Sequence, residues 1–297
     1  MRLVTRGDLD GLTCAVLICI NEEIDDILLV HPQAITDGKV EILSTDIVTN
    51  LPYQPGCAMW FDHHHHTATV AAPHEEFRGA FGAAPSAARL VYEYYGGKTA
   101  MPQYDELVRE TDRLDSADLV REDIESPQGY VKLGFTIDSR SGLGAYESYF
   151  MTLLDLLIKN RPLAEIFAHP EVKKRCDLLD HADSLFRESL ISSSHLDGNV
   201  VVTDFRNLDH VPMGNRFLVY ALFPEANVSV RLQWGPNQEH VMMTLGHSIF
   251  NRTCKTNVGE LAARYGGGGH AGAGSVPLID DPDFQVGMMI AELKANG

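Results

Sequence analysis

The order of apolar and polar residues along the chain predicts an α/β protein. In the N-terminal part, short apolar runs typical of strands alternate with longer stretches typical of helices. We expect strands at 3–5, 27–30, 40–44 and 58–61, and helices at 11–20, 86–95 and 104–113. Because helices separate strands in this pattern, the sheet should be parallel and doubly wound.

A largely helical stretch from 151 to 191 separates this region from a second α/β pattern. Further strands are expected at 199–203, 227–234 and 240–245, followed by a helix at 258–265. The sequence therefore predicts a first domain at 1–150, a helical linker at 151–195, and a smaller α/β domain at 196–297.

Composition narrows the class of protein. The 297 residues are 44% hydrophobic and carry a formal net charge of -17, which disfavours tight nonspecific binding to long nucleic acid. A small anionic substrate held at a metal ion is compatible with this charge. No apolar run approaches the roughly 18 residues of a membrane helix, and the N-terminus does not resemble a signal peptide. We expect a cytoplasmic protein without a membrane partner.

Acidic and imidazole residues follow three of the predicted strands. In an open α/β sheet, ligands bind at the carboxyl ends of the strands. Carboxylate and neutral imidazole are good ligands for Mn, Zn, Fe and Co, so these residues predict a hydrolytic metal site. They are Asp8 and Asp10 in Asp8-Leu9-Asp10-Gly11, then Asp46, and then Asp62, His63, His64, His65 and His66.

Each of these motifs has a simpler interpretation when it is taken alone. Asp8 and Asp10 could form an acidic helix cap or turn, and Asp46 could merely end a strand. His65 and His66 are more typical of an exposed loop. The prediction of a metal site rests on the three motifs together.

A glycine-rich run at 266–270 suggests a second kind of chemistry. Successive backbone N–H groups in such a turn form a concave nest for anions, and His270 could add a donor. Upstream, Arg252 could clamp a phosphate with two parallel hydrogen bonds. A flexible hinge and a solvated arginine are the respective alternatives.

Together these motifs resemble the DHH phosphoesterase family, in the branch that carries the DHH-associated C-terminal domain. Asp8-Leu9-Asp10-Gly11 resembles the first motif, Asp46 the second and Asp62-His63-His64 the third. Asp112, within Glu110-Thr111-Asp112-Arg113, is the best match to the fourth motif. Gly266-Gly267-Gly268-Gly269-His270 resembles the signature of the second domain.

The resemblance implies a phosphohydrolase with two metal ions, usually Mn²⁺, with Mg²⁺ or Co²⁺ as other options. One ion would be held by Asp10, Asp46, His63 and Asp112, and the other by Asp8 and Asp46. Asp62 would orient a histidine, while His64 would contact phosphate or protonate the leaving oxygen. The substrate would be gripped across a cleft by the second domain, through Arg252, Gly267, Gly268, Gly269 and His270.

The chain departs from the family pattern at the first motif. A histidine is usual two or four positions before the first aspartate, where this chain has Arg6 and Val4. Three interpretations stay open. The first ion could be weakly held, with water, His65 or His66 filling the gap; Arg6 could supply a fixed positive charge; or catalysis could be lost.

The expected activity is hydrolysis of phosphodiester or phosphomonoester bonds in short oligonucleotides or small phosphorylated nucleotides. This class includes exonucleases and oligoribonucleases. The alternatives are an exopolyphosphatase or pyrophosphatase, and a noncatalytic nucleotide-binding protein with a degenerate metal site. A homodimer is one option for the oligomeric state.

Overall fold

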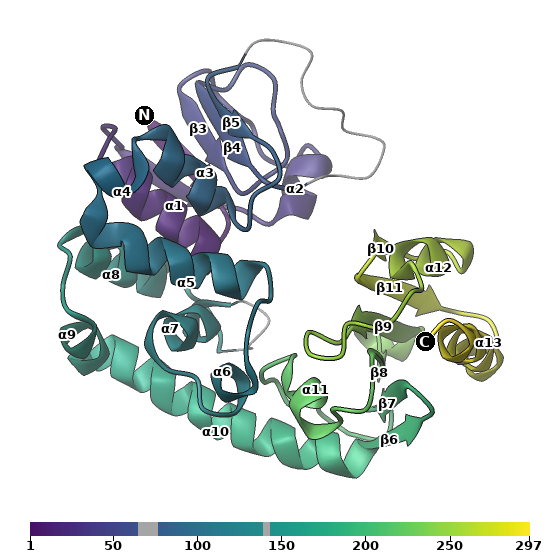
Figure 1. The fold of residues 1–297 in the computed structure, drawn as a ribbon. Helices are drawn as coiled ribbons and strands as arrows, with labels where there is room; N and C mark the ends of the chain where they lie inside the picture. Colours follow the sequence, from purple (N-terminus) through teal and green to yellow (C-terminus); the bar gives the residue numbers. More distant parts are fainter. Residues whose placement is uncertain (65–76, 139–142) are drawn as a thin grey trace. The chain divides into compact units, whose positions relative to one another are not determined.

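A computed structural model describes residues 1–64, 77–138 and 143–297 of the chain (Figure 1). These residues form two compact units. The first comprises residues 1–119 and 127–180, and the second comprises residues 120–126 and 181–297.

The first unit contains a five-stranded sheet in which every neighbouring pair of strands is parallel. The strand order is β2-β1-β3-β4-β5, which confirms the predicted parallel α/β architecture. The strands are β1 (Arg2–Thr5), β2 (Asp26–Leu29), β3 (Asp46–Thr49), β4 (Met59–Asp62) and β5 (Gly79–Phe81).

One predicted strand of this sheet is misplaced. Residues 40–44 form a loop in which Val40 and Ile42 pack against a small apolar cluster. The strand that follows, β3, begins only at Asp46 and ends at Thr49. Asp46 therefore starts a strand that it was expected to follow.

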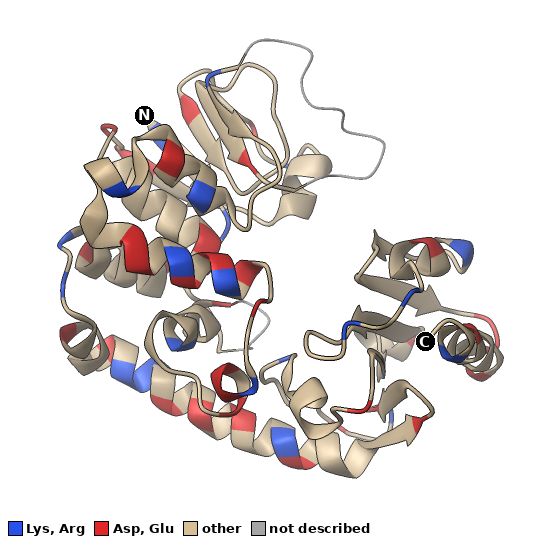
Figure 2. Ribbon diagram, in the orientation of Figure 1, with Lys and Arg blue, Asp and Glu red and all other residues tan. Residues whose placement is uncertain are grey.

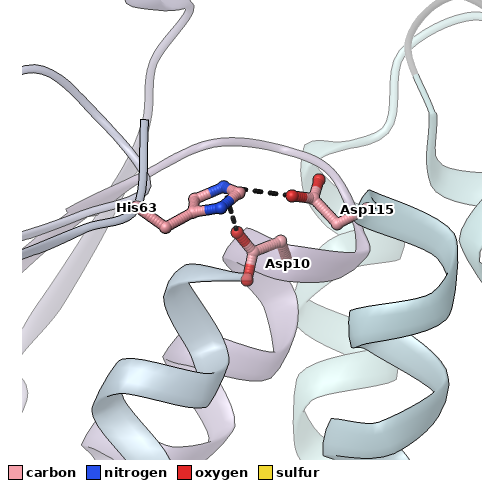
Figure 3. A group of neighbouring side chains, drawn as sticks. All are labelled: Asp10, His63 and Asp115. Carbon is pink, nitrogen blue, oxygen red and sulfur yellow. Dashed lines mark ion pairs between the residues drawn. The ribbon is translucent and has the colours of Figure 1, made fainter. Parts of the chain in front are cut away.

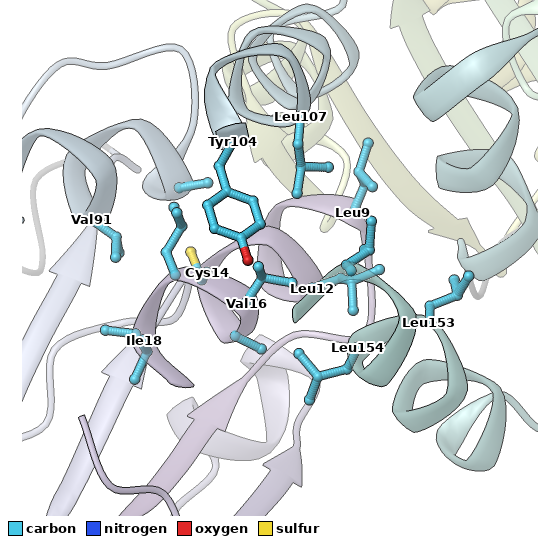
Figure 4. Packing of buried hydrophobic residues seen from close by; sticks show 14 of the residues in the cluster. Leu9, Leu12, Cys14, Val16, Ile18, Val91, Tyr104, Leu107, Leu153 and Leu154 are labelled. Carbon is cyan, nitrogen blue, oxygen red and sulfur yellow. The ribbon is translucent and has the colours of Figure 1, made fainter. Parts of the chain in front are cut away.

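Several helices of the first unit pack around a buried helix, α1. This helix is largely apolar, and every residue from Leu9 to Ile18 is buried, as expected for a helix inside a core. Its residues pack against α3, α5 and α8 (Figure 4). The helices are α1 (Leu9–Cys19), α2 (Pro32–Thr36), α3 (Ala87–Tyr94), α4 (Gly97–Ala100), η1 (Pro102–Tyr104), α5 (Asp105–Asp115), α7 (Gly129–Ile137), α8 (Glu147–Ile158) and α9 (Leu163–Ala168).

The helical stretch that was expected to be a linker is divided between the units. Leu153 and Leu154 of α8 and Ile166 of α9 belong to the core of the first unit. The long helix α10 (Pro170–Ser193) contains the boundary between the units, after Asp180. The structure thus places the division within a helix and leaves no separate linker domain.

The second unit contains a mixed six-stranded sheet in the order β10-β11-β9-β8-β7-β6. Alternate residues of β8, among them Val228, Val230 and Leu232, are buried against helices α12 and α13. The strands are β6 (Ser194–Asp197), β7 (Val200–Asp204), β8 (Val228–Trp234), β9 (Val241–His247), β10 (Gly268–His270) and β11 (Ala273–Leu278). The helices are α6 (Arg121–Glu125), α11 (Leu218–Leu222), η3 (Pro236–Gln238), α12 (Val258–Arg264) and α13 (Pro282–Ala295).

Acidic side chains outnumber basic ones, 41 to 24, and the two kinds are mixed along exposed helices such as α5 and α10 (Figure 2). Within the described part of the chain, every helix is too short or too polar to span a lipid bilayer.

Candidate metal centre

Three side chains meet at the carboxyl edge of the parallel sheet. Asp10 comes from the first turn of α1, His63 directly follows β4, and Asp115 ends α5 (Figure 3). The Nε2 atom of His63 lies 3.0 Å from Oδ2 of Asp115 and 3.8 Å from Oδ2 of Asp10. One ligand atom from each residue lies within 4.8 Å of the others, so the three can face one small ion.

Asp10 is held in place by the start of a second helix. The backbone N–H groups of Ala87 and Ala88, in the first turn of α3, donate to its two oxygens at 3.0 and 2.7 Å. The N-terminus of a helix favours a negative charge at this position. Burial and the nearby charge of Asp115 nevertheless hold the pKa of Asp10 well above its usual range. The charged form of Asp10 is therefore disfavoured without a cation beside it, and a bound cation would favour it.

His63 is oriented by the carbonyl oxygen of Ala84, which lies 3.0 Å from Nδ1. A carbonyl can only accept, so Nδ1 carries the proton and Nε2 faces the carboxylates. Burial acts to lower the pKa of His63, but pairing with Asp115 and the charge of Asp10 outweigh it and raise the pKa to about 9. The same pairing outweighs burial and lowers the pKa of Asp115.

These residues fit a divalent metal ion. The Nε2 atom of His63 is buried and faces the carboxylates of Asp115 and Asp10, at 3.0 and 3.8 Å. Ligands that bind an ion at about 2.1 Å lie roughly 3.0–3.5 Å from one another, close to the spacing seen here. One imidazole and two carboxylates suit Mn, Zn, Fe or Co, and the carbonyl behind His63 is the usual support for a metal-binding histidine.

Asp62 builds the turn that carries the two histidines. It is fully buried, and its Oδ1 accepts the backbone N–H groups of His63 and His64 at 3.0 and 3.3 Å. The same oxygen lies 2.7 Å from Nδ1 of His64. Asp62 thus orients the ring of His64, whose side chain is 35% exposed.

Asp8 caps helix α1 and is enclosed by three donors. Its Oδ1 accepts from the backbone N–H of Gly11 at 3.0 Å and from Nδ2 of Asn50 at 3.1 Å. Its Oδ2 lies 3.1 Å from Nε of Arg6. A side chain at position 11 would put its Cβ 2.0 Å from the carbonyl oxygen of Arg6, so glycine is required for this turn.

The prediction that Asp46 bridges two metal ions is wrong. Asp46 begins β3 and lies opposite Arg2 in the neighbouring strand β1, at the edge of the sheet away from His63. It is fully buried, and its carboxylate accepts from Nε of Arg2 at 3.0 Å and from Nη2 of Arg2 at 2.5 Å. The residue at the carboxyl end of β3 is Asn50.

Asp112 was expected to be the fourth acidic ligand, and the structure does not bring it to the centre. Its Oδ1 accepts from Ser86 at 2.6 Å, and its Oδ2 accepts from two nitrogens of Arg89 at 2.9 and 2.6 Å. The residue that joins Asp10 and His63 is Asp115, three positions later on the same helix. The acidic run after the predicted helix at 104–113 was the available sequence signal for it.

The remaining predicted site residues lie elsewhere in the chain. His65 and His66 fall outside the described residues. In the second unit, Arg252 is exposed and donates from Nε to the carbonyl of Ile249 at 2.9 Å. His270 is also exposed, and its Nδ1 accepts from the backbone N–H of Gly272 at 3.3 Å.

The glycine-rich run forms a strand over most of its length, which differs from the predicted open turn. Gly268 and Gly269 belong to β10, which pairs with β11 in a tight antiparallel hairpin. Gly269 has φ of 155°, and a Cβ there would lie 2.2 Å from the carbonyl oxygen of Ala273. A Cβ on Gly267 would lie 2.1 Å from the carbonyl oxygen of Ser275. Close backbone packing therefore accounts for these glycines.

A solved structure of a pGpG-specific phosphodiesterase, PggH from Vibrio cholerae, matches the chain from end to end. The two are 39% identical, the match covers 100% of this chain and 99% of that one, and the TM-score is 0.87. The chain belongs to the DHH phosphoesterase family. The predicted activity class, hydrolysis of phosphate esters, is confirmed for this DHH phosphoesterase.

More distant structures share its fold. An exopolyphosphatase-related protein from Bacteroides fragilis is 15% identical with a TM-score of 0.57, and the match covers 99% of this chain and 91% of that one. RecJ in complex with Mn²⁺ from Thermus thermophilus is 14% identical with a TM-score of 0.56, and the match covers 99% of this chain and 51% of RecJ. The chain itself matches no protein-family model and no curated protein.

Proposed function

We propose that the chain is a metal-dependent phosphodiesterase that hydrolyses pGpG or a closely similar linear dinucleotide. The observation that carries this proposal is its 39% identity, over the full length of both chains, to a pGpG-specific phosphodiesterase. The formal net charge of -17 also suits a short substrate better than a long nucleic acid.

The proposed metal ligands are Asp10, His63 and Asp115, with Mn²⁺ as the expected ion. When bound, the ion supplies Lewis-acid chemistry by neutralising phosphate charge and activating water. The residues of the chain hold this centre rigidly. Asp10 is fixed by the first turn of α3 and His63 by the carbonyl of Ala84.

His64 is the proposed general acid. Hydrolysis of the internal phosphodiester forms a bond from water oxygen to phosphorus, breaks the bond from phosphorus to O3′, and requires a proton on the departing O3′. Asp62 holds Nδ1 of His64, so Nε2 is the nitrogen that can deliver this proton. Each turnover of pGpG would release two molecules of GMP.

The substrate-binding role predicted for residues of the second unit is also part of the proposal. Arg252, His270, Gly267, Gly268 and Gly269 of the second unit are proposed to bind a phosphate of the substrate. A cytoplasmic location and a homodimer stay predictions.

A substrate panel tests the proposal. The full chain is supplied with Mn²⁺ and offered pGpG, cyclic diguanylate, 3′-phosphoadenosine 5′-phosphate and polyphosphate at several concentrations. We expect the highest kcat/KM for pGpG, with GMP as the product resolved by chromatography. A higher kcat/KM for polyphosphate, or release of inorganic phosphate without GMP, would contradict the proposal.

A further inference from the structure

We propose that this centre holds a single divalent ion and that the guanidinium of Arg6 supplies, beside Asp8, the positive charge of a second ion. The inference deepens the proposed function and rests on it for the substrate, but the number of ions can be measured independently of activity. The inference rests on the residues around Asp8. They are a cation and neutral donors, whereas the cluster of Asp10, His63 and Asp115 contains two carboxylates.

Both oxygens of Asp8 already have partners. Oδ1 accepts from Gly11 and Asn50, and Oδ2 pairs with Arg6. The hydrogen bond from Gly11 caps helix α1, so it could not be released without cost to that helix. A carboxylate that is engaged in this way is poorly available to a metal ion.

Asn50 stands where a second carboxylate would be needed. It follows β3 at the carboxyl edge of the sheet, is fully buried, and turns its amide nitrogen toward Asp8. The opposite amide orientation would set two oxygen acceptors against each other. Asn50 therefore donates to Asp8 and adds no negative charge.

Asp8 and its direct side-chain partners, Arg6 and Asn50, carry no net charge. Asp8 contributes one negative charge, Arg6 one positive charge and Asn50 none. Divalent ions of the Mg²⁺ or Mn²⁺ type are bound chiefly by carboxylates, and a fixed guanidinium repels them. Around His63, in contrast, the two carboxylates of Asp10 and Asp115 outnumber the one imidazole.

Arg6 is suited to bind the substrate's phosphate. Its side chain is 25% exposed, and among the described residues its ion pair is with Asp8 alone, through Nε. A guanidinium has five N–H donors in a planar fork that matches phosphate oxygens. Asp8 is thus a positioning residue for Arg6, and Arg6 contacts the anion.

The number of bound ions tests the inference. The metal-depleted full chain is equilibrated with excess Mn²⁺, and tightly bound manganese is counted by elemental analysis after dialysis. We expect one Mn²⁺ per chain, with the electron paramagnetic resonance signal of an isolated ion. Two tightly bound, exchange-coupled ions in the unaltered chain would overturn the inference, and this result needs no variant.

Variants test whether Arg6 and Asn50 are the reason that only one ion binds. The double variant Arg6→His/Asn50→Asp removes the fixed cation and adds an imidazole and a carboxylate, so we expect it to bind a second Mn²⁺. Arg6→Lys keeps the charge and should still bind one ion, as should the control Arg78→His, whose exposed arginine pairs with Glu22. A folded double variant that still binds one ion would show that these residues do not exclude the second.

Activity separates this inference from the proposed function. Arg6→Ala should lower kcat/KM for pGpG by about 100-fold, the order expected for removal of one donor to a reacting phosphate, and Arg6→Lys should recover part of the loss. Unchanged kcat/KM in Arg6→Ala would overturn the role of Arg6. One bound Mn²⁺ without hydrolysis of pGpG would refute the proposed substrate and leave the one-ion centre intact.

Discussion

Acidic side chains in this protein act as helix cap, as ion-pair partner or, in the proposed function, as metal ligand, according to their position on an element. Asp112 and Asp115 lie three residues apart and so share one side of α5. The resemblance selected Asp112, and the acidic cluster at the end of the helix did not single out Asp115. In the structure, Ser86 and Arg89 donate hydrogen bonds to the carboxylate of Asp112. Asp115 instead lies beside His63.

Substitution of each of these two aspartates checks this assignment. Asp115→Asn should weaken Mn²⁺ binding by about 100-fold or more, since it removes a charged ligand. Asp112→Asn is the matched control. It should leave Mn²⁺ affinity nearly unchanged and should lower the free energy of unfolding by about 1–3 kcal/mol, because Arg89 loses a charged acceptor.

Titration calorimetry gives the affinities, and chemical denaturation gives the stabilities. If Asp112→Asn lost Mn²⁺ affinity while Asp115→Asn kept it, the sequence resemblance would be correct and the assignment from the structure would be wrong.

At the scale of elements, the sequence predicts seven strands in the right order but misplaces one by a few residues, and it does not predict β5, β6, β10 or β11. The run from Val40 to Val48 contains two apolar stretches, and the first was taken for the strand. Packing explains the difference: Val40 and Ile42 are only partly buried and pack against the cluster that contains Val48, whereas Ile47 and Val48 are fully buried in the sheet. The shift moves Asp46 from one edge of the sheet to the other.

The new position of Asp46 predicts a structural role. Asp46→Asn should lower the free energy of unfolding by about 1–3 kcal/mol, because Arg2 would lose its charged, buried partner. Mn²⁺ affinity should not change. Asp25→Asn is a suitable control, since Asp25 pairs with the N-terminus at the same edge but its side chain is 88% exposed, and exposed pairs contribute little.

Denaturant unfolding and Mn²⁺ titration on the same preparations test this role. Loss of Mn²⁺ binding in a stably folded Asp46→Asn protein would restore Asp46 as a ligand.

At the scale of the whole molecule, the presence of two α/β regions was predictable, and the division of the chain between them was not. The periodic pattern shows that α8 and α9 have apolar faces, but it cannot tell which core buries them. In the structure their leucines and isoleucine pack with α1, and residues 120–126 belong to the second unit although residues on both sides belong to the first. Such long-range pairing leaves no local mark in the sequence.

The proposed metal centre depends on the whole fold, because Asp10, His63 and Asp115 come from three separate segments that the fold brings together. The most direct test is hydrolysis of pGpG by the full chain after removal of metal by a chelator and after return of Mn²⁺. His63→Ala is compared with His195→Ala, which replaces an exposed histidine of β6 in the second unit.

We predict that the metal-depleted wild-type chain is inactive, that Mn²⁺ restores it and His195→Ala alike, and that His63→Ala stays at least about 1,000-fold slower. Folded His63→Ala that hydrolyses pGpG at the wild-type rate, or a wild-type rate that survives removal of metal, would contradict the account.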